Sequence, residues 1–255
     1  MNSIERAAGI ALLTIASLGI LVTAEGPAEV VVRHIGVVDG AGRLLPERDI
    51  VVRGTRIATL APAGQPLPPA KTVIEGSGKF AIAGLVDADA RTSAFTPAAA
   101  QALLARGVTT IADRTGDPAR LERWRQDLAS GRAYGPKLAP PCGQQGGVAA
   151  ASAPSALDAV HDALARLVAA GRTPAQAIAT FTRENARALC LDAVGTLAPG
   201  QAADFLVLGA NPLEDIRASR AIDAVIFRGE VLTQAHIQML RRGTLPPPTP
   251  PTPGR

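Results

Sequence analysis

Short β-branched runs occur near both ends of this chain and enclose a region in which strands alternate with helices. The first runs lie within residues 30–83, and later runs occupy residues 204–208 and 224–227. Apolar runs bounded by Gly and Asp are typical of β-hairpins, whereas strands that alternate with helices indicate parallel βα units. Within 255 residues we therefore expect a small all-β module, then an α/β region, and then a return to β-structure.

Three helices of the middle region begin with the same signal, a capping side chain followed by proline. The pairs are Thr96-Pro97, Asp117-Pro118 and Thr173-Pro174. The Thr or Asp oxygen can accept a hydrogen bond from the first turn, and proline is favoured at the first helical position. We expect the first two helices to end at Gly107 and Gly131 and the third to reach about Leu189.

The charge pattern argues against a nucleic-acid partner. The formal charge is +4, but basic and acidic residues are interleaved, as in residues 120–127. Proteins that bind nucleic acid gather Lys and Arg on one face. We expect no nucleic-acid surface.

The N-terminus resembles a targeting segment. Residues 2–6 carry one arginine, residues 7–24 carry no charge, and Val22-Thr23-Ala24 offers small residues at a cleavage point. We expect a signal peptide over residues 1–24, cleaved after Ala24, and a periplasmic or secreted protein. A retained membrane anchor formed by residues 7–24 and a buried helix are the alternatives.

The chain has two cysteines, Cys142 and Cys190. In an oxidising compartment they could form a disulfide, but two cysteines do not make a framework. Two separate buried thiols are the favoured interpretation, and pairing stays open. Residues 244–255 are rich in proline and predict an extended, solvated tail.

Residues 84–91 read Gly-Leu-Val-Asp-Ala-Asp-Ala-Arg and resemble the opening barrel strand of the amidohydrolase superfamily, P-G-L-I-D followed by H-x-H. In this sequence Asp89 and Arg91 occupy the two histidine positions. Other segments are similar to the imidazolonepropionase- and prolidase-like branch, in the same order along the chain: residues 36–40, 49–58, 107–113, 134–138, 170–178 and 194–208.

This resemblance implies an α/β plus β fold. A composite β-sandwich, built from residues 28–83 and 195–235, would flank a (β/α) TIM-type barrel over residues 84–194. A complete barrel of this type needs roughly 200–250 residues, whereas residues 84–193 supply far fewer. We therefore expect an internally shortened barrel of three or four βα units.

The resemblance also implies a site that has changed. Alternate residues of a strand share a face, so Asp87, Asp89 and Arg91 are expected to point together, as an internal ion pair. A weaker alternative is a hard-cation site that includes Asp89 and Asp113. The family's divalent, zinc-type metal is expected to be lost, and we assign no catalytic residue and no metal ligand.

The three histidines, His34, His161 and His236, do not have ligand spacing. The chain also has no Gly-x-Ser-x-Gly nucleophile signature. Residues 148–155, where the last barrel strand should end in a catalytic aspartate, contain no acid.

By resemblance, proteins of this kind are metal-dependent hydrolases of C–N bonds in non-peptide amides, cyclic amides or dipeptides, with small-molecule substrates. We expect this chain to be catalytically degenerate. The alternatives are a non-catalytic binding or assembly module, self-associating through an open half-barrel, and a decayed gene product.

Overall fold

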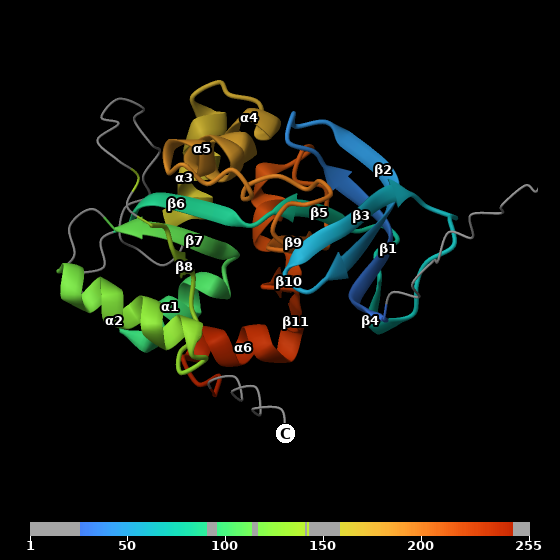
Figure 1. Ribbon diagram of the computed structural model, residues 1–255. Coiled ribbons are helices and arrows are strands. Elements are labelled where there is room, and N and C mark those ends of the chain that lie inside the picture. The colour runs from blue at the N-terminus through green and yellow to red at the C-terminus, as the bar shows by residue number, and fades with distance from the viewer. Residues whose placement is uncertain (1–25, 91–95, 114–116, 141, 143–158, 247–255) are drawn as a thin grey trace, which may run out of the picture.

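The computed structural model describes residues 26–90, 96–113, 117–140, 142 and 159–246. Strands from both ends of the chain form one mixed sheet in the order β11-β10-β9-β5-β1-β2-β3, with β4 paired to β1 (Figure 1). The strands are β1 (Ala28–Val38), β2 (Leu44–Arg53), β3 (Arg56–Pro62), β4 (Ala70–Glu75), β5 (Phe80–Ala83), β9 (Phe205–Leu208), β10 (Ile222–Phe227) and β11 (Glu230–Leu232).

The pairing of β5 with β9 joins the two ends of the chain. These strands are antiparallel, with Ile82 opposite Leu206, which confirms that N- and C-terminal segments share a β-structure. The expected sandwich of two sheets is instead one hydrogen-bonded sheet. It curls so far that the turn before β3 reaches the segment before β9, where Ala203 N–H donates to Thr55 O at 2.8 Å.

A bulge at His34 lets β1 pair with several neighbouring strands. The register of β1 against β2 shifts between Val32 and Ile35, and His34 has a φ of 52°. Its backbone N–H donates to the buried carboxylate of Asp49 at 2.9 Å. The first part of β1 therefore pairs with β4 and the last part with β5.

Both faces of the central strands are buried. Side chains alternate between the faces of a strand, and each face packs into its own hydrophobic cluster. The inside of the curled sheet contains Ala81, Ala83, Phe205, Val207, Ala224 and Ile226. The opposite face packs against the helices through Ile82, Leu206, Leu208, Val225 and Phe227.

The middle of the chain forms a parallel three-stranded sheet, β6 (Leu85–Ala90), β7 (Val108–Asp113) and β8 (Lys137–Leu138). Helices α1 (Pro97–Leu104) and α2 (Pro118–Ala129) connect these strands. The side chains of Thr96 and Asp117 cap them as predicted. These pairings confirm the parallel βα units, and within the described residues the sheet that they form has three strands.

The remaining helices are α3 (Ala159–Ala169), α4 (Pro174–Ala179), the π-helical turn η2 (Thr180–Glu184), α5 (Asn185–Ala188), the 3₁₀ turn η3 (Ile216–Arg220) and α6 (Gln234–Arg242). Thr173 caps α4 in a capping box. The helical span predicted from Thr173 to about Leu189 is present, but it is not one regular helix, because Phe181 has non-helical angles (φ −89°, ψ 15°) and kinks it. Helix α6 was not predicted; it buries Ile237 and Leu240 and ends at Gly243.

The two sheets are joined by a partly buried ion pair. Lys137 Nζ of β8 lies 2.5 Å from Asp204 Oδ2, just before β9. The other carboxylate oxygen accepts the backbone N–H of Arg228 at 2.8 Å. Asp204 is 5% exposed, so each of its oxygens has a donor where water is largely excluded.

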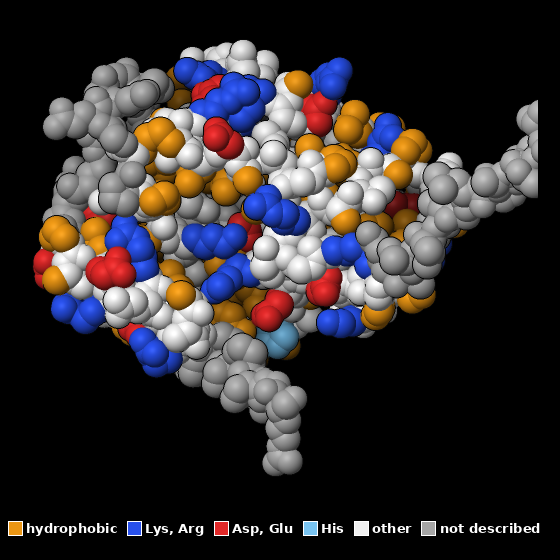
Figure 2. Space-filling model, in the orientation of Figure 1, with side chains coloured by type: hydrophobic (Ala, Val, Ile, Leu, Met, Phe, Trp, Pro, Cys, Tyr) orange, Lys and Arg blue, Asp and Glu red, His pale blue; other side chains and the backbone are white. Residues whose placement is uncertain are grey.

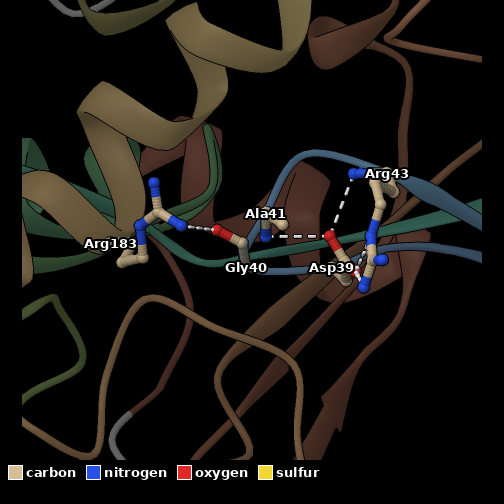
Figure 3. A network of polar contacts seen from close by, with 5 residues as sticks. All are labelled: Asp39, Gly40, Ala41, Arg43 and Arg183. Atoms are coloured by element: carbon tan, nitrogen blue, oxygen red, sulfur yellow. Dashed lines mark hydrogen bonds and ion pairs between the residues drawn. The ribbon is translucent and has the colours of Figure 1, made fainter.

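The loop between β1 and β2 is anchored to η2 (Figure 3). Asp39 Oδ1 accepts the backbone N–H groups of Ala41 and Arg43, and Asp39 Oδ2 accepts the Arg43 guanidinium at 2.8–2.9 Å. The Arg183 guanidinium, on η2, donates to Gly40 O. A tight carboxylate-centred turn is thus held against the helices next to β6.

Cys142 and Cys190 are joined in a disulfide, with their Cα atoms 5.9 Å apart. The favoured prediction of two separate thiols is therefore wrong. Sequence spacing did not indicate this pairing, because only the fold brings the segment that follows β8 next to the end of α5. The bond links the βα region to its last helices.

One residue near the start of the predicted proline-rich tail, Leu245, is buried rather than solvated. The amide of Gln101 on α1 exchanges two hydrogen bonds with the backbone of Leu245, at 2.9 and 3.1 Å, and both residues are buried. Residues 247–255 and the predicted signal peptide, residues 1–24, lie outside the described residues. None of the helices that the structure describes has the length and apolarity needed to span a bilayer.

Figure 2 shows Lys and Arg side chains scattered among Asp and Glu side chains on the visible face, which matches the interleaved charges of the sequence. Among the described residues, the large hydrophobic side chains that are exposed are Leu44 and Val73, at 36% and 57%. Both belong to the eight-stranded sheet, and neither lies on β6, β7 or β8.

Candidate functional site

The candidate site lies at the carboxyl ends of β6 and β7. Ala90 is paired with Asp113 in the parallel register, and the arrowheads of both strands point to the same side of the molecule (Figure 1). Ligand sites of parallel α/β structures form at this edge. The predicted site residues Asp87, Asp89 and Asp113 therefore come from neighbouring strands and one end of the sheet.

Asp87 is the most enclosed of these acids. Asp87 is 6% exposed, and its Oδ1 accepts a hydrogen bond from the backbone N–H of Asp89 at 3.2 Å. Asp89 is partly exposed. Arg91, the third residue of this face, lies outside the described residues, so its ion pair with the aspartates stays a prediction.

The other edge of β6 is covered by a helix instead of a strand. Asn185, the first residue of α5, is 1% exposed, and its Nδ2 donates to the backbone oxygen of Val86 at 2.8 Å. In a closed barrel that carbonyl would accept a hydrogen bond from a neighbouring strand. Sequence reasoning missed Asn185, because an asparagine within a helical segment carries no signal of what it bonds.

All three histidines are engaged away from this edge. His34 Nδ1 lies 3.0 Å from Glu75 Oε1, and this hydrogen bond, with one from Ser77, lowers the pKa of the Glu75 carboxyl. His236 Nδ1 accepts the Thr233 backbone N–H at the start of α6. His161 is buried, with its ring nitrogens 2.9 Å from Ser219 Oγ and Arg106 O.

Among the described residues, the metal-binding side chains at the candidate site are therefore the carboxylates of Asp87, Asp89 and Asp113. In the part of the chain that the structure describes, no three His, Cys, Asp or Glu side chains are arranged to hold a metal ion. The weaker prediction of a cation site at Asp89 and Asp113 gains no support from the described residues.

A sequence model described as the amidohydrolase family matches residues 143–232. Over these residues the chain is similar to the amidohydrolase family. The match covers the segment from before α3 to the end of β11, including the return into the large sheet. No curated protein matches the chain.

Solved amidohydrolase-like structures share this fold. Molinate hydrolase aligns with a TM-score of 0.67 and 13% identity over 88% of this chain and 99% of its own. A Xaa-Pro dipeptidase with methionine bound in its active site aligns with a TM-score of 0.63 and 12% identity, over 80% of this chain and 99% of its own. Phenylurea hydrolase B aligns with a TM-score of 0.65 and 14% identity, over 81% of this chain and 97% of its own. At these identities the likeness concerns the fold: a mixed sheet with helices that matches a shortened amidohydrolase-like structure.

Proposed function

We propose that this chain is an amidohydrolase-superfamily protein that has lost metal-dependent hydrolysis of C–N bonds. The names of the similar structures denote hydrolases of Xaa-Pro dipeptides, molinate and phenylureas. The ancestral substrate class is accordingly a small molecule with a hydrolysable C–N bond: a non-peptide amide, a cyclic amide or a dipeptide.

One observation carries this proposal: every histidine of the chain has partners remote from the carboxyl ends of β6 and β7. His34 is bonded to Glu75, His161 to Ser219 and Arg106, and His236 to Thr233. The residues present do not fit a histidine-bound zinc-type metal, which requires imidazole or thiolate ligands around one point. Asp89 and Arg91 stand at the positions where the family motif has its histidines.

Steady-state hydrolysis assays test the proposal. Purified protein supplied with Zn²⁺ or Mn²⁺ is incubated with a panel of Xaa-Pro dipeptides, lactams and aryl amides, with and without a chelator. We expect no rate above the uncatalysed background. A rate that disappears on chelation and returns with metal would contradict the proposal.

The double variant Asp89→His, Arg91→His tests whether the protein lacks only these two metal ligands or also the rest of the active site. It restores the two histidines of the family motif, while the rest of the shortened barrel is unchanged. We expect this variant to stay inactive on the same panel, because two imidazoles do not replace the other ligands and the substrate pocket. Recovered activity would show that the substitutions alone had silenced an otherwise complete site.

We also propose that the protein is exported, with a signal peptide cleaved after Ala24. The disulfide between Cys142 and Cys190 supports this proposal, because disulfides persist in oxidising compartments and are rare in the cytosol. The intact mass of the protein isolated from its native host tests it. A chain that begins at Glu25 is expected, and a chain that retains residues 7–24 favours the membrane anchor.

A further inference from the structure

Helix α5 leads into Cys190, one of the two residues of the disulfide. The backbone N–H of Cys190 donates to Arg187 O at 3.0 Å, and that of Leu191 donates to Ala186 O at 2.9 Å. This pair of hydrogen bonds is the Schellman motif, which ends a helix on a residue in the left-handed conformation. That residue is Cys190, whose φ is 57°. The disulfide is therefore attached at the point where the chain turns out of α5.

Glycine is the residue usually found at this position, because a side chain crowds the backbone when φ is positive. Helices α3 and α6 end with the same pair of hydrogen bonds, and each has a glycine there: Gly171, with a φ of 93°, and Gly243, with a φ of 67°. Cys190 therefore holds a conformation that its own side chain disfavours. The bond to Cys142 offsets that preference, because it anchors the side chain to the segment after β8.

Helix α5 depends on contacts with other elements. It has four residues, and an isolated helix of this length is not stable in water. The kink at Phe181 also separates it from α4. Asn185 anchors its start to Val86 O of β6, Ala186 is buried, and the disulfide anchors its end. Of these contacts, the disulfide is the one that a chemical reaction can remove and restore.

The disulfide lies where a reductant can reach it. Cys190 is exposed and Cys142 is partly exposed. Reduction requires a thiolate to approach one of the two sulfur atoms, so access governs its rate, and exposed disulfides are the labile ones. We therefore expect a dithiol to reduce this bond while the rest of the protein stays folded.

We propose that the disulfide between Cys142 and Cys190 is a redox switch that sets how firmly α5 covers the edge of β6. A thiolate of an external dithiol attacks Cys190 Sγ, forms a mixed disulfide and releases Cys142 as a thiolate, which takes up a proton. The second thiol of the reductant then attacks its own bound sulfur and releases Cys190. Two electrons and two protons thereby pass to the protein, and the reductant becomes a disulfide.

Reduction releases the residue that ends α5. Cys190 can then leave the left-handed conformation, and the two hydrogen bonds of the Schellman motif are lost with it. Because α5 is only about one turn long, this local opening extends to its first residue, Asn185. Asn185 then donates to Val86 O for less of the time, and the edge of β6 beside Asp87 opens more often.

Nuclear magnetic resonance on the mature protein tests this proposal, in the oxidised form and after reduction with dithiothreitol in the absence of denaturant. We expect the backbone order parameters of residues 189–191 to fall from about 0.85 to below about 0.6 on reduction, while those of β2 stay at about 0.85. The side-chain amide resonances of Asn185 should shift toward those of a solvated amide. Unchanged order at residues 189–191, an equal loss of order in β2, or a bond that dithiothreitol reduces only in denaturant would each overturn the proposal.

Two variants without the disulfide form a matched pair. Cys142→Ser, Cys190→Ser keeps a side chain at the left-handed position, whereas Cys142→Ser, Cys190→Gly places a glycine there, as in α3 and α6. We expect the serine variant to lose order at residues 189–191, as the reduced protein does, and the glycine variant to retain it. Equal order parameters in the two variants would mean that the left-handed position has no part in the switch, and would also overturn the proposal.

Discussion

Asn185 is the residue on which the open edge of the parallel sheet depends. Its amide occupies the place at Val86 O that a neighbouring strand takes in a closed barrel. A buried carbonyl that loses its donor costs more than an average hydrogen bond contributes, because the group cannot return to water. This edge of β6 is therefore stabilised in part by one side chain of α5.

Asn185→Ala is expected to lower the free energy of unfolding by about 1–3 kcal/mol, since it leaves Val86 O without this donor. Urea denaturation followed by circular dichroism measures the change. Arg187→Ala, at an exposed position of the same helix, is the control and should change the value by less than about 0.5 kcal/mol. Equal effects of the two substitutions would mean that the hydrogen bond to Val86 is unimportant.

Asp39 gives the protein a pH-dependent contribution to stability. Burial raises the pKa of this carboxyl, but the N–H groups of Arg43 and Ala41 and the Arg43 guanidinium outweigh burial, and the net pKa lies below its ordinary value. A carboxyl whose pKa is lowered by folding stabilises the protein above its unfolded pKa of about 3.9. That stabilisation is lost as the pH falls through the lower pKa of the folded state.

Asp39→Asn is therefore expected to lower the free energy of unfolding at pH 7 by about 1–2 kcal/mol. The difference from the unsubstituted protein should shrink as the pH falls below about 4. Urea denaturation at a series of pH values measures it. Asp192→Asn, at an exposed position, is the control, and a difference for Asp39→Asn that stays constant down to the lowest pH would contradict this account.

At the scale of the element, the disulfide from Cys142 to Cys190 closes a separation of 48 residues that contains α3, α4 and α5. Cross-linking a loop of this length stabilises a protein mainly by restricting the unfolded chain. These helices include α5, which carries Asn185. The disulfide thus constrains the same segment that supplies Asn185, the residue bonded to β6.

The double variant Cys142→Ser, Cys190→Ser is expected to lower the free energy of unfolding by about 2–4 kcal/mol. Denaturation of the unsubstituted protein with and without reductant provides the matched comparison. Thiol titration of the unfolded, non-reduced protein should find no free thiol, and two free thiols in that assay would contradict the pairing.

The sequence predicted those elements that are determined by residues close together in the chain. Thr96, Asp117 and Thr173 cap helices as their context indicated, because a capping side chain acts within one turn. Helix α6 and the break at Phe181 escaped prediction. Both depend on contacts between distant segments, since α6 packs on α1 and β10, and tertiary packing overrides local propensity.

The sequence predicted where the candidate site lies, but it did not predict the contacts around it. Residues 84–91 and 107–113 gave the strands whose carboxyl ends hold Asp87, Asp89 and Asp113. The partner that covers β6 lies almost a hundred residues away, and the pairing of Cys142 with Cys190 also depends on the completed fold. Nothing in the spacing of these residues could indicate that they meet.

For the whole molecule, the shortened α/β region does not leave an apolar opening in the part that the structure describes. The edge of β6 is covered by α5, and the exposed large hydrophobic side chains of the described residues, Leu44 and Val73, lie on the other sheet. Self-association through β6 needs the edge of that strand to be free or an apolar face beside it to be exposed. The expected assembly through an open half-barrel therefore gains no support here.

We expect the mature protein to be a monomer in solution. Size-exclusion chromatography with light scattering measures the mass over a range of concentrations. A single peak with the mass of one chain is the expected result. A dimer that persists on dilution would favour the assembly module over the degenerate enzyme.

The metal content of the purified mature protein tests the central claim, the loss of the family's metal site, most directly. Protein produced with Zn²⁺ and Mn²⁺ in the medium is desalted and analysed by inductively coupled plasma mass spectrometry, beside the variant Asp89→Ala. We expect far less than one divalent ion per chain in both proteins. A stoichiometric ion in the unsubstituted protein that disappears in Asp89→Ala would contradict it.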